Sequence, residues 1–265
     1  MLKRLDHWLM GKVARMDTDR LFQKYYYSDP AFVDGTTQFH RFCCERIRAG
    51  AKILEIGAGP SNRTSAYLAS IGTVVGVDVS DEVLGNQFLA TADVYGGNIL
   101  PYEDASFDAC VSDFVLEHIV EPAEHFLQVA RVLKPGGTYC FRTPNLLHYV
   151  AIASWVLPHS LHRGFANRLR GLDGGHHEPY PTVYRANTRS VIRRMCQSVG
   201  LGLEDMLLIE KEPSYGRAHS LLFFAMLAYE RLVNSARILE TFRVNILGCA
   251  RRGEALPTRR GIANC

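Results

Sequence analysis

The sequence predicts a doubly wound α/β fold, in which helices cover both faces of a mostly parallel, seven-stranded sheet. Three observations support this prediction. Short apolar runs alternate with helical patterns from residue 51 onward, and single-helix connections of this kind build parallel sheets. The first run, Ile53 to Ile56, ends abruptly at Gly57, as a buried strand does when it enters a cofactor loop. Roughly 20 residues later, a second run ends in the carboxylate of Asp78, which is the usual position of a ribose-binding acid.

Each element follows from the hydrophobic pattern and the turn residues around it. The expected strands are 52–56, 73–78, a short third strand ending near Asn98-Ile99, 107–112, 138–142, 201–210 and 245–250. The expected helices include one around Phe39–Ile47 and others at 121–133, 146–157, 188–199 and 219–239. This order divides the chain into an N-terminal helical cap (1–50), a cofactor-binding core (51–143), an insertion or lid (144–187), the C-terminal part of the core with an apolar helix (188–252) and a basic tail (253–265).

The composition narrows the class of protein. The 265 residues are 47% hydrophobic and 22% charged, as in a folded protein with one large domain and additions. The net charge of +3 is too small to indicate a nucleic-acid partner. The seven cysteines include no C-x-x-C pair, which favours a reducing compartment and no metal centre. We expect a cytoplasmic protein without signal peptide or membrane-spanning helix, because no apolar run is long enough.

The glycine turn and the acid suit an adenine-containing cofactor. Glycines at this position let the backbone approach a ligand closely. The helix that follows near Asn62 presents free N–H groups and partial positive charge. A carboxylate at Asp78 can accept both hydroxyls of a ribose. These features alone do not decide which adenine cofactor binds.

Four stretches together resemble the class I S-adenosylmethionine-dependent methyltransferases, of the type 11-like branch that includes quinone-biosynthesis enzymes. In order, they are LEIGAGPSN at 54–62, VVGVDVS at 74–80, LPYEDASFDACVSDFVLEHI at 100–119 and LQVARVLKPGGTYCFRTPN at 127–145. The resemblance covers 51–145 well and 182–210 moderately. It implies a Rossmann-like methyltransferase fold, S-adenosylmethionine as cofactor and methyl transfer as activity.

Two alternatives remain open at this point. A nicotinamide-dependent oxidoreductase shares the glycine turn and the ribose acid, but its G-x-G-x-x-G fingerprint would need a glycine where Asn62 stands. Glu55, two residues before the first glycine, fits the methyltransferase pattern instead, although Ser61 replaces that family's usual third glycine. The other alternative is a cofactor-binding scaffold without catalytic activity.

The resemblance implies a role for each residue of the cofactor site. Glu55 would lie near the methionine ammonium, and Asp78 would bind the ribose diol. The remaining implied contacts are Gly57, Ala58 and Gly59 along methionine and ribose, Val79 beside adenine, Asn98 and Ile99 at the adenine edge, and Ser112 and Asp113 facing the methionine moiety.

The methyl acceptor is less well defined. His118 is a candidate general base for a hydroxyl acceptor, with a structural role in its loop as the alternative. His176 and His177, in the insertion, are candidate substrate contacts, unless they simply belong to a surface loop. We expect a small-molecule or a lipid- or sugar-linked acceptor, methylated on oxygen.

The helix at 219–239 is more apolar than a surface helix needs to be. We interpret it as core or subunit packing, which would allow a homodimer. Peripheral contact with a membrane is the alternative.

Overall fold

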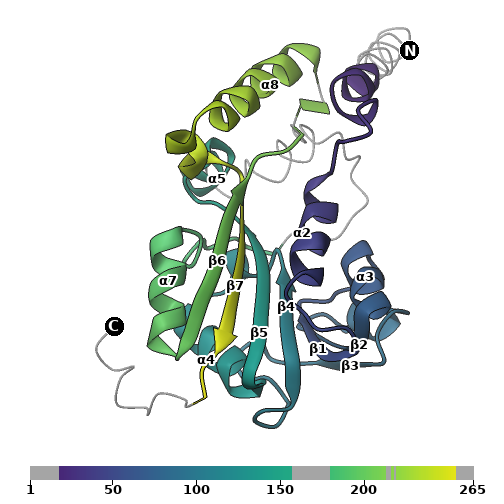
Figure 1. Ribbon diagram of the computed structural model, residues 1–265, viewed down its shortest axis with the longest axis vertical. Coiled ribbons are helices and arrows are strands. Elements are labelled where there is room, and N and C mark those ends of the chain that lie inside the picture. Colours follow the sequence, from purple (N-terminus) through teal and green to yellow (C-terminus); the bar gives the residue numbers. More distant parts are fainter. Residues whose placement is uncertain (1–17, 157–179, 213–215, 218, 255–265) are drawn as a thin grey trace, which may run out of the picture.

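The computed structural model describes residues 18–156, 180–212, 216–217 and 219–254, with backbone only for 153–156. Its centre is one seven-stranded sheet in the order β3-β2-β1-β4-β5-β7-β6 (Figure 1). The strands are β1 Ala51–Ile56, β2 Gly72–Asp78, β3 Thr91–Val94, β4 Phe107–Asp113, β5 Leu133–Pro144, β6 Leu201–Ile209 and β7 Asn245–Arg252. The first five are parallel to one another, and β7 runs antiparallel between β5 and β6. The predicted fold class is therefore confirmed.

Helices cover both faces of this sheet, with α2 and α3 on one face and α4 and α7 on the other (Figure 1). The helices are α2 Gly35–Cys44, α3 Arg63–Ile71, α4 Pro122–Val132, α5 Tyr149–Val156, α7 Arg189–Ser198 and α8 Ser220–Ser235. Short helical turns are η1 Gln23–Tyr27, η2 Asp81–Gly85, η3 Leu116–His118 and η5 Arg237–Phe242. The predicted helix at 188–199 is capped by Thr188, whose hydroxyl accepts from the N–H of Val191.

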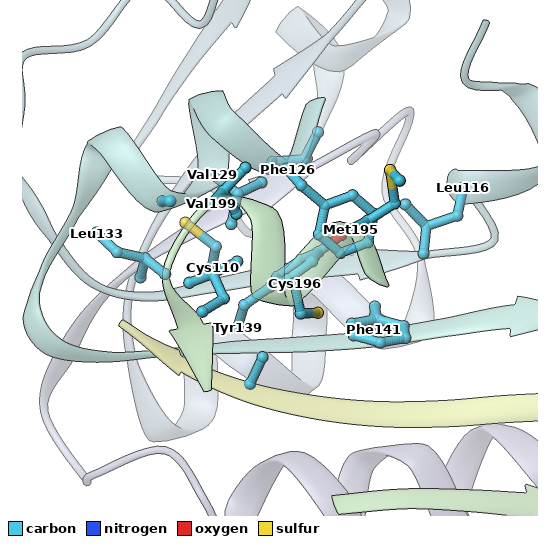
Figure 2. Packing of buried hydrophobic residues seen from close by; sticks show 14 of the residues in the cluster. Cys110, Leu116, Phe126, Val129, Leu133, Tyr139, Phe141, Met195, Cys196 and Val199 are labelled. Carbon is cyan, nitrogen blue, oxygen red and sulfur yellow. The ribbon is translucent and has the colours of Figure 1, made fainter. Parts of the chain in front are cut away.

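The core consists of two large clusters, one on each face of the sheet. One cluster joins α4 and α7 to β4 and β5, and Figure 2 shows how Phe126, Tyr139, Phe141 and Met195 interlock there. The other joins α2 and α3 to the opposite face, with Phe39 fully buried. Strands with both faces covered explain the nearly continuous apolar runs in the sequence.

The predicted position of the third strand is wrong. Residues 98 and 99 lie in a loop, and β3 is formed by Thr91–Val94, which pairs with β2 from Val75 to Asp78. As an edge strand, β3 has three exposed residues of four, so no apolar run marks it in the sequence.

Helix α8 packs away from the sheet, at the end of the molecule to which the parallel strands point (Figure 1). Its inner side contacts a third cluster, in which Phe22, Tyr26 and Phe223 are buried. Among the described helices, none is long and apolar enough to cross a membrane. Of the predicted lid and tail, residues 157–179 and 255–265 lie outside the described residues.

Candidate cofactor-binding site

A cleft of about 470 Å³ opens where β1, β2 and β4 end. One wall contains Gly57, Asp78, Val79 and the loop Tyr95–Asn98. The rest of the lining comes from residues that follow β4 and enter α4, namely Phe114, Val115, His118, Ile119, Val120, Glu121, Glu124 and His125, and from Tyr180. Ligands of doubly wound sheets bind at this edge because the carboxyl ends of the parallel strands meet there.

The loop after β1 adopts the tight conformation that its glycines predict. Gly57 and Gly59 have φ angles of +72° and +54°, which side chains other than glycine rarely adopt. A Cβ atom at Gly57 would also collide with the side chain of Val115, which follows β4. Asn62 stabilises the loop, because its amide donates to the carbonyl of Ala58 (2.7 Å) while its carbonyl caps α3. At Asn62, where the nicotinamide fingerprint would have its third glycine, this chain therefore has a side chain that stabilises the turn.

Asp78 holds the loop and faces the cleft. One carboxylate oxygen accepts from the N–H of Gly59 at 2.9 Å, and the other accepts from the N–H of Ser80 at 2.9 Å. The short helix η2 is capped by Ser80 rather than by Asp78. A side chain fixed by two backbone donors at the end of β2 is oriented for a diol ligand.

Glu55 is buried beside this loop, with only 3% of its surface exposed. Its Oε2 atom has no hydrogen-bond partner among the described residues. Burial raises the pKa of the carboxyl to about 8 against an opposing hydrogen bond from Ser65, and the nearby charges of Asp113 and Asp78 raise it further. A buried carboxylate oxygen without a donor is suited to a cationic ligand group.

Ser112 and Asp113 end β4 and point to opposite faces of the sheet. The Ser112 hydroxyl is fully buried and bonds the Tyr139 hydroxyl at 2.8 Å. Asp113 forms two hydrogen bonds with Arg142 (2.6 and 2.7 Å) and accepts a third from Thr64. Neither residue lines the cleft, so both side chains are engaged in holding the strand end.

The two residues predicted at the adenine edge behave differently. Asn98 lines the cleft beside Gly96 and Gly97. Ile99 does not line it and is 68% exposed. Ala58 and Gly59 belong to the loop but do not line the cleft either, which leaves Gly57 as its contact surface.

His118, in the turn η3, lines the cleft and also contacts the segment that begins at Pro181. Its Nδ1 atom lies 3.0 Å from the carbonyl oxygen of Pro181. A carbonyl only accepts hydrogen bonds, so Nδ1 donates in this contact. The other ring nitrogen, Nε2, lies 4.0 Å from a carboxylate oxygen of Glu117. The backbone of the preceding Glu117 accepts from the N–H groups of Val183 and Tyr184. The turn therefore anchors residues 181–184 against the cleft.

Comparison with known proteins identifies the family to which this arrangement belongs. The model of a methyltransferase domain matches residues 54–141. A demethylmenaquinone methyltransferase of Corynebacterium kroppenstedtii is 33% identical over 161 residues, covering 57% of this chain and 69% of that protein. A malonyl-[acyl-carrier protein] O-methyltransferase of Erwinia billingiae is 30% identical over 182 residues, covering 63% and 67%. The chain belongs to the S-adenosylmethionine-dependent methyltransferases.

Other relatives match only part of their own length, and solved structures share the fold. The chain spans 31% and 56% of the length of two further curated relatives that it matches, an uncharacterised transposon protein of Streptomyces fradiae and a demethylmenaquinone methyltransferase of Clavibacter sepedonicus. The phosphoethanolamine N-methyltransferase 2 of Haemonchus contortus, solved with S-adenosylmethionine, has a TM-score of 0.52 at 16% identity, covering 83% of this chain and 53% of that one. At such low identity, the likeness concerns the fold alone.

The residues of this methyltransferase fit S-adenosylmethionine. The unpartnered Oε2 of Glu55 is chemically suited to an ammonium group, although Glu55 lies behind the loop and does not itself line the cleft. Gly57 does line the cleft, at a point where a Cβ atom would collide with Val115. Asp78, Val79 and Asn98 all line the cleft, as ribose and adenine contacts would. Ser112 and Asp113 end β4 directly before the lining residues Phe114 and Val115, and they are held there by their bonds to Tyr139 and Arg142.

Several lining residues were not predicted from the sequence. Phe114 has a φ angle of +58° and turns its ring into the cleft wall directly after β4, a position that the strand end could have suggested. Tyr95 and Tyr180 come from loops, where no periodic pattern marks them. His176 and His177 lie outside the described residues.

Proposed function

We propose that the protein transfers the methyl group of S-adenosylmethionine to an oxygen atom of a small-molecule or a lipid- or sugar-linked acceptor. The observation that carries the proposal is Asp78, held by two backbone N–H groups at the end of β2 and facing the cleft. The oxygen target is supported by the name of one relative, an O-methyltransferase, and by the position of His118, which lines the cleft and is oriented by its contact with the carbonyl of Pro181.

The bound cofactor supplies a methyl group on a sulfonium, a leaving group that is already activated. The chain's own residues then mainly align the reactants. Glu55 would hold the ammonium group of the cofactor's methionine part, and Asp78 would hold the two ribose hydroxyls. The glycine loop between these two residues would contact the cofactor through its backbone. His118 Nε2 accepts the hydroxyl proton of the acceptor as the oxygen is methylated.

Cofactor choice is tested by calorimetry with S-adenosylhomocysteine and with NAD. We expect binding of the first only, and a loss of about 10–100-fold in affinity for Asp78→Ala, since two charge-assisted hydrogen bonds to ribose are removed. Asp81→Ala is the matched control, because this acid lies three residues further on, in η2. Binding of NAD alone would instead favour the oxidoreductase alternative.

Activity is tested by offering methyl-labelled S-adenosylmethionine with separate aqueous and lipid extracts of cells. Wild-type protein and Asp81→Ala should label the same product, and Asp78→Ala should label it at least tenfold more slowly. The scaffold alternative gains support if binding is intact but neither extract is labelled. His118→Gln, which retains a hydrogen-bond donor, should lower kcat more than it raises KM if the imidazole accepts the proton.

A further inference from the structure

Helix α8 is apolar on two opposite sides. Its inner side, with Phe223, Met226 and Val233, is buried against the N-terminal aromatic cluster. Its outer side carries an exposed stripe at helical spacing, consisting of Leu221, Phe224, Ala225, Ala228 and Leu232. Leu221 and Leu232 are 74% and 58% exposed. A helix that is apolar all round is normally covered on both sides.

The exposed apolar surface continues into the neighbouring elements. Ile238 and Phe242 of η5 are 83% and 44% exposed. Helix α5 meets α8 through Tyr149 and Tyr229, whose ring centroids lie 4.6 Å apart, and Tyr149 and Ile152 are themselves exposed. Contiguous apolar surface of this kind marks a binding face rather than ordinary solvent exposure. We call the surface of α8, η5 and α5 that carries these side chains the apolar face.

Basic side chains border the apolar face, and the acids of α8 and η5 are engaged with other residues. Arg231 and Arg237 are exposed at the end of α8 and the start of η5. Lys24 lies over the ring of Tyr25, which contacts Phe224. The one acid in α8, Glu230, is buried, accepts from the Tyr26 hydroxyl and also pairs with Arg231 at 3.4 Å. The positive charge of the border that is not paired in this way belongs to Lys24 and Arg237. In η5, Glu240 is paired with Arg189. The border is thus positively charged.

We propose that the apolar face binds the surface of an anionic lipid bilayer. Apolar side chains enter the boundary between headgroups and acyl chains, while the basic border meets the lipid phosphates, as in interfacial amphipathic helices. A second copy of the chain fits less well, because a two-fold contact places the same basic borders opposite each other. The parallel strands point to the end of the molecule that carries α8 (Figure 1), so the bilayer lies at the end where the cleft opens.

The test is sedimentation of the full chain with vesicles of phosphatidylglycerol and phosphatidylcholine, and with vesicles of phosphatidylcholine alone. We expect binding to the anionic vesicles, weakened by high salt. The triple variant Leu221→Ser, Leu232→Ser, Ile238→Ser should lose at least tenfold in partitioning, since three exposed apolar side chains are removed. Leu84→Ser, equally exposed on η2, should bind as wild type does.

A charge variant separates the two contributions. Lys24→Glu with Arg237→Glu should reduce binding to anionic vesicles about tenfold or more and leave the weak binding to phosphatidylcholine unchanged. Thermal melting controls for folding of each variant. Equal partitioning of wild type and the triple variant would overturn the proposal. So would a dimer, seen by analytical ultracentrifugation, that the triple variant dissociates while no vesicle binding is detected.

Discussion

At the scale of single residues, the buried carboxyl of Glu55 lowers the stability of the fold and is also our proposed partner for the cofactor's ammonium group. Its carboxyl ionises near pH 4.5 in the unfolded chain and has a pKa of about 8 in the folded one. Between these pH values the folded protein keeps a proton that the unfolded chain has released, so stability falls as the pH rises. The ionised form is nevertheless the one that suits the ammonium group of the cofactor.

This conflict predicts opposite effects of Glu55→Gln. Removing the ionisable group should raise the free energy of unfolding by about 2–3 kcal/mol at pH 7 and by much less at pH 5. The same change should weaken binding of S-adenosylhomocysteine about 10–100-fold, because a charge-assisted contact is lost. Chemical denaturation at pH 5, 6 and 7, together with calorimetry, measures both effects. A variant that is less stable than wild type at pH 7 would contradict the buried, unpartnered state of this carboxyl.

At the scale of elements, the turn η3 is joined to the end of β5 and to the segment before α7. The Thr143 hydroxyl donates to buried Glu117 at 3.1 Å, and Asn187 donates to the same hydroxyl at 2.7 Å. Burial raises the pKa of Glu117 to about 7. The contacts connect three elements that are distant in sequence, and they position the cleft wall that contains His118.

Asn187→Ala should loosen this junction. It removes the donors to Thr143 and to the carbonyl of Pro144, which should cost about 1–3 kcal/mol of stability. The amides of Val183 and Tyr184, bonded to Glu117, should then exchange hydrogen faster. Asn234→Ala, which removes one hydrogen bond to Glu230 in α8, is the control and should leave these two amides unchanged. Unaltered exchange in Asn187→Ala would show that the segment is held by other contacts.

At the scale of the whole molecule, a polar chain crosses from β5 to α2. Arg142 pairs with Asp113, Asp113 accepts from Thr64, and Thr64 lies 3.2 Å from the ring of His40. The side chains of Arg142 and Asp113 are only 5% and 14% exposed. The guanidinium also lies 4.4 Å from the ring centroid of Phe114, so the pair connects the cleft wall to the helices behind it.

Removing one partner of this pair should destabilise the fold more than removing both. Arg142→Gln leaves a buried carboxylate without its cation, at a cost of about 3–5 kcal/mol. Adding Asp113→Asn removes that charge and should restore part of the stability. Denaturation of the two single variants and the double variant measures the coupling energy. Additive losses would mean that the two charges do not depend on each other.

The sequence predicted those parts of the fold and site that depend on neighbouring residues. Strand β1, the turn at Gly57 and the acid at Asp78 lie close together along the chain, so their pattern is local and visible. The position of strand β3 was predicted wrongly, because an edge strand buries few side chains and therefore shows no apolar run in the sequence. The predicted roles of Ser112 and Asp113 depended on position alone, and their side chains instead bond Tyr139 and Arg142, which lie on another strand.

The sequence by itself determined the doubly wound class, the glycine loop and the acid that faces the cleft, because hydrophobic period and turn residues set backbone conformation locally. Only the tertiary structure decided which polar groups find partners. It left Glu55 Oε2 without a donor, paired Asp113 with Arg142, and exposed the outer side of α8. The pairing and exposure of these side chains depend on which distant segments pack together. Burial then decides whether a charged group finds a partner, has its pKa shifted or stays available to a ligand.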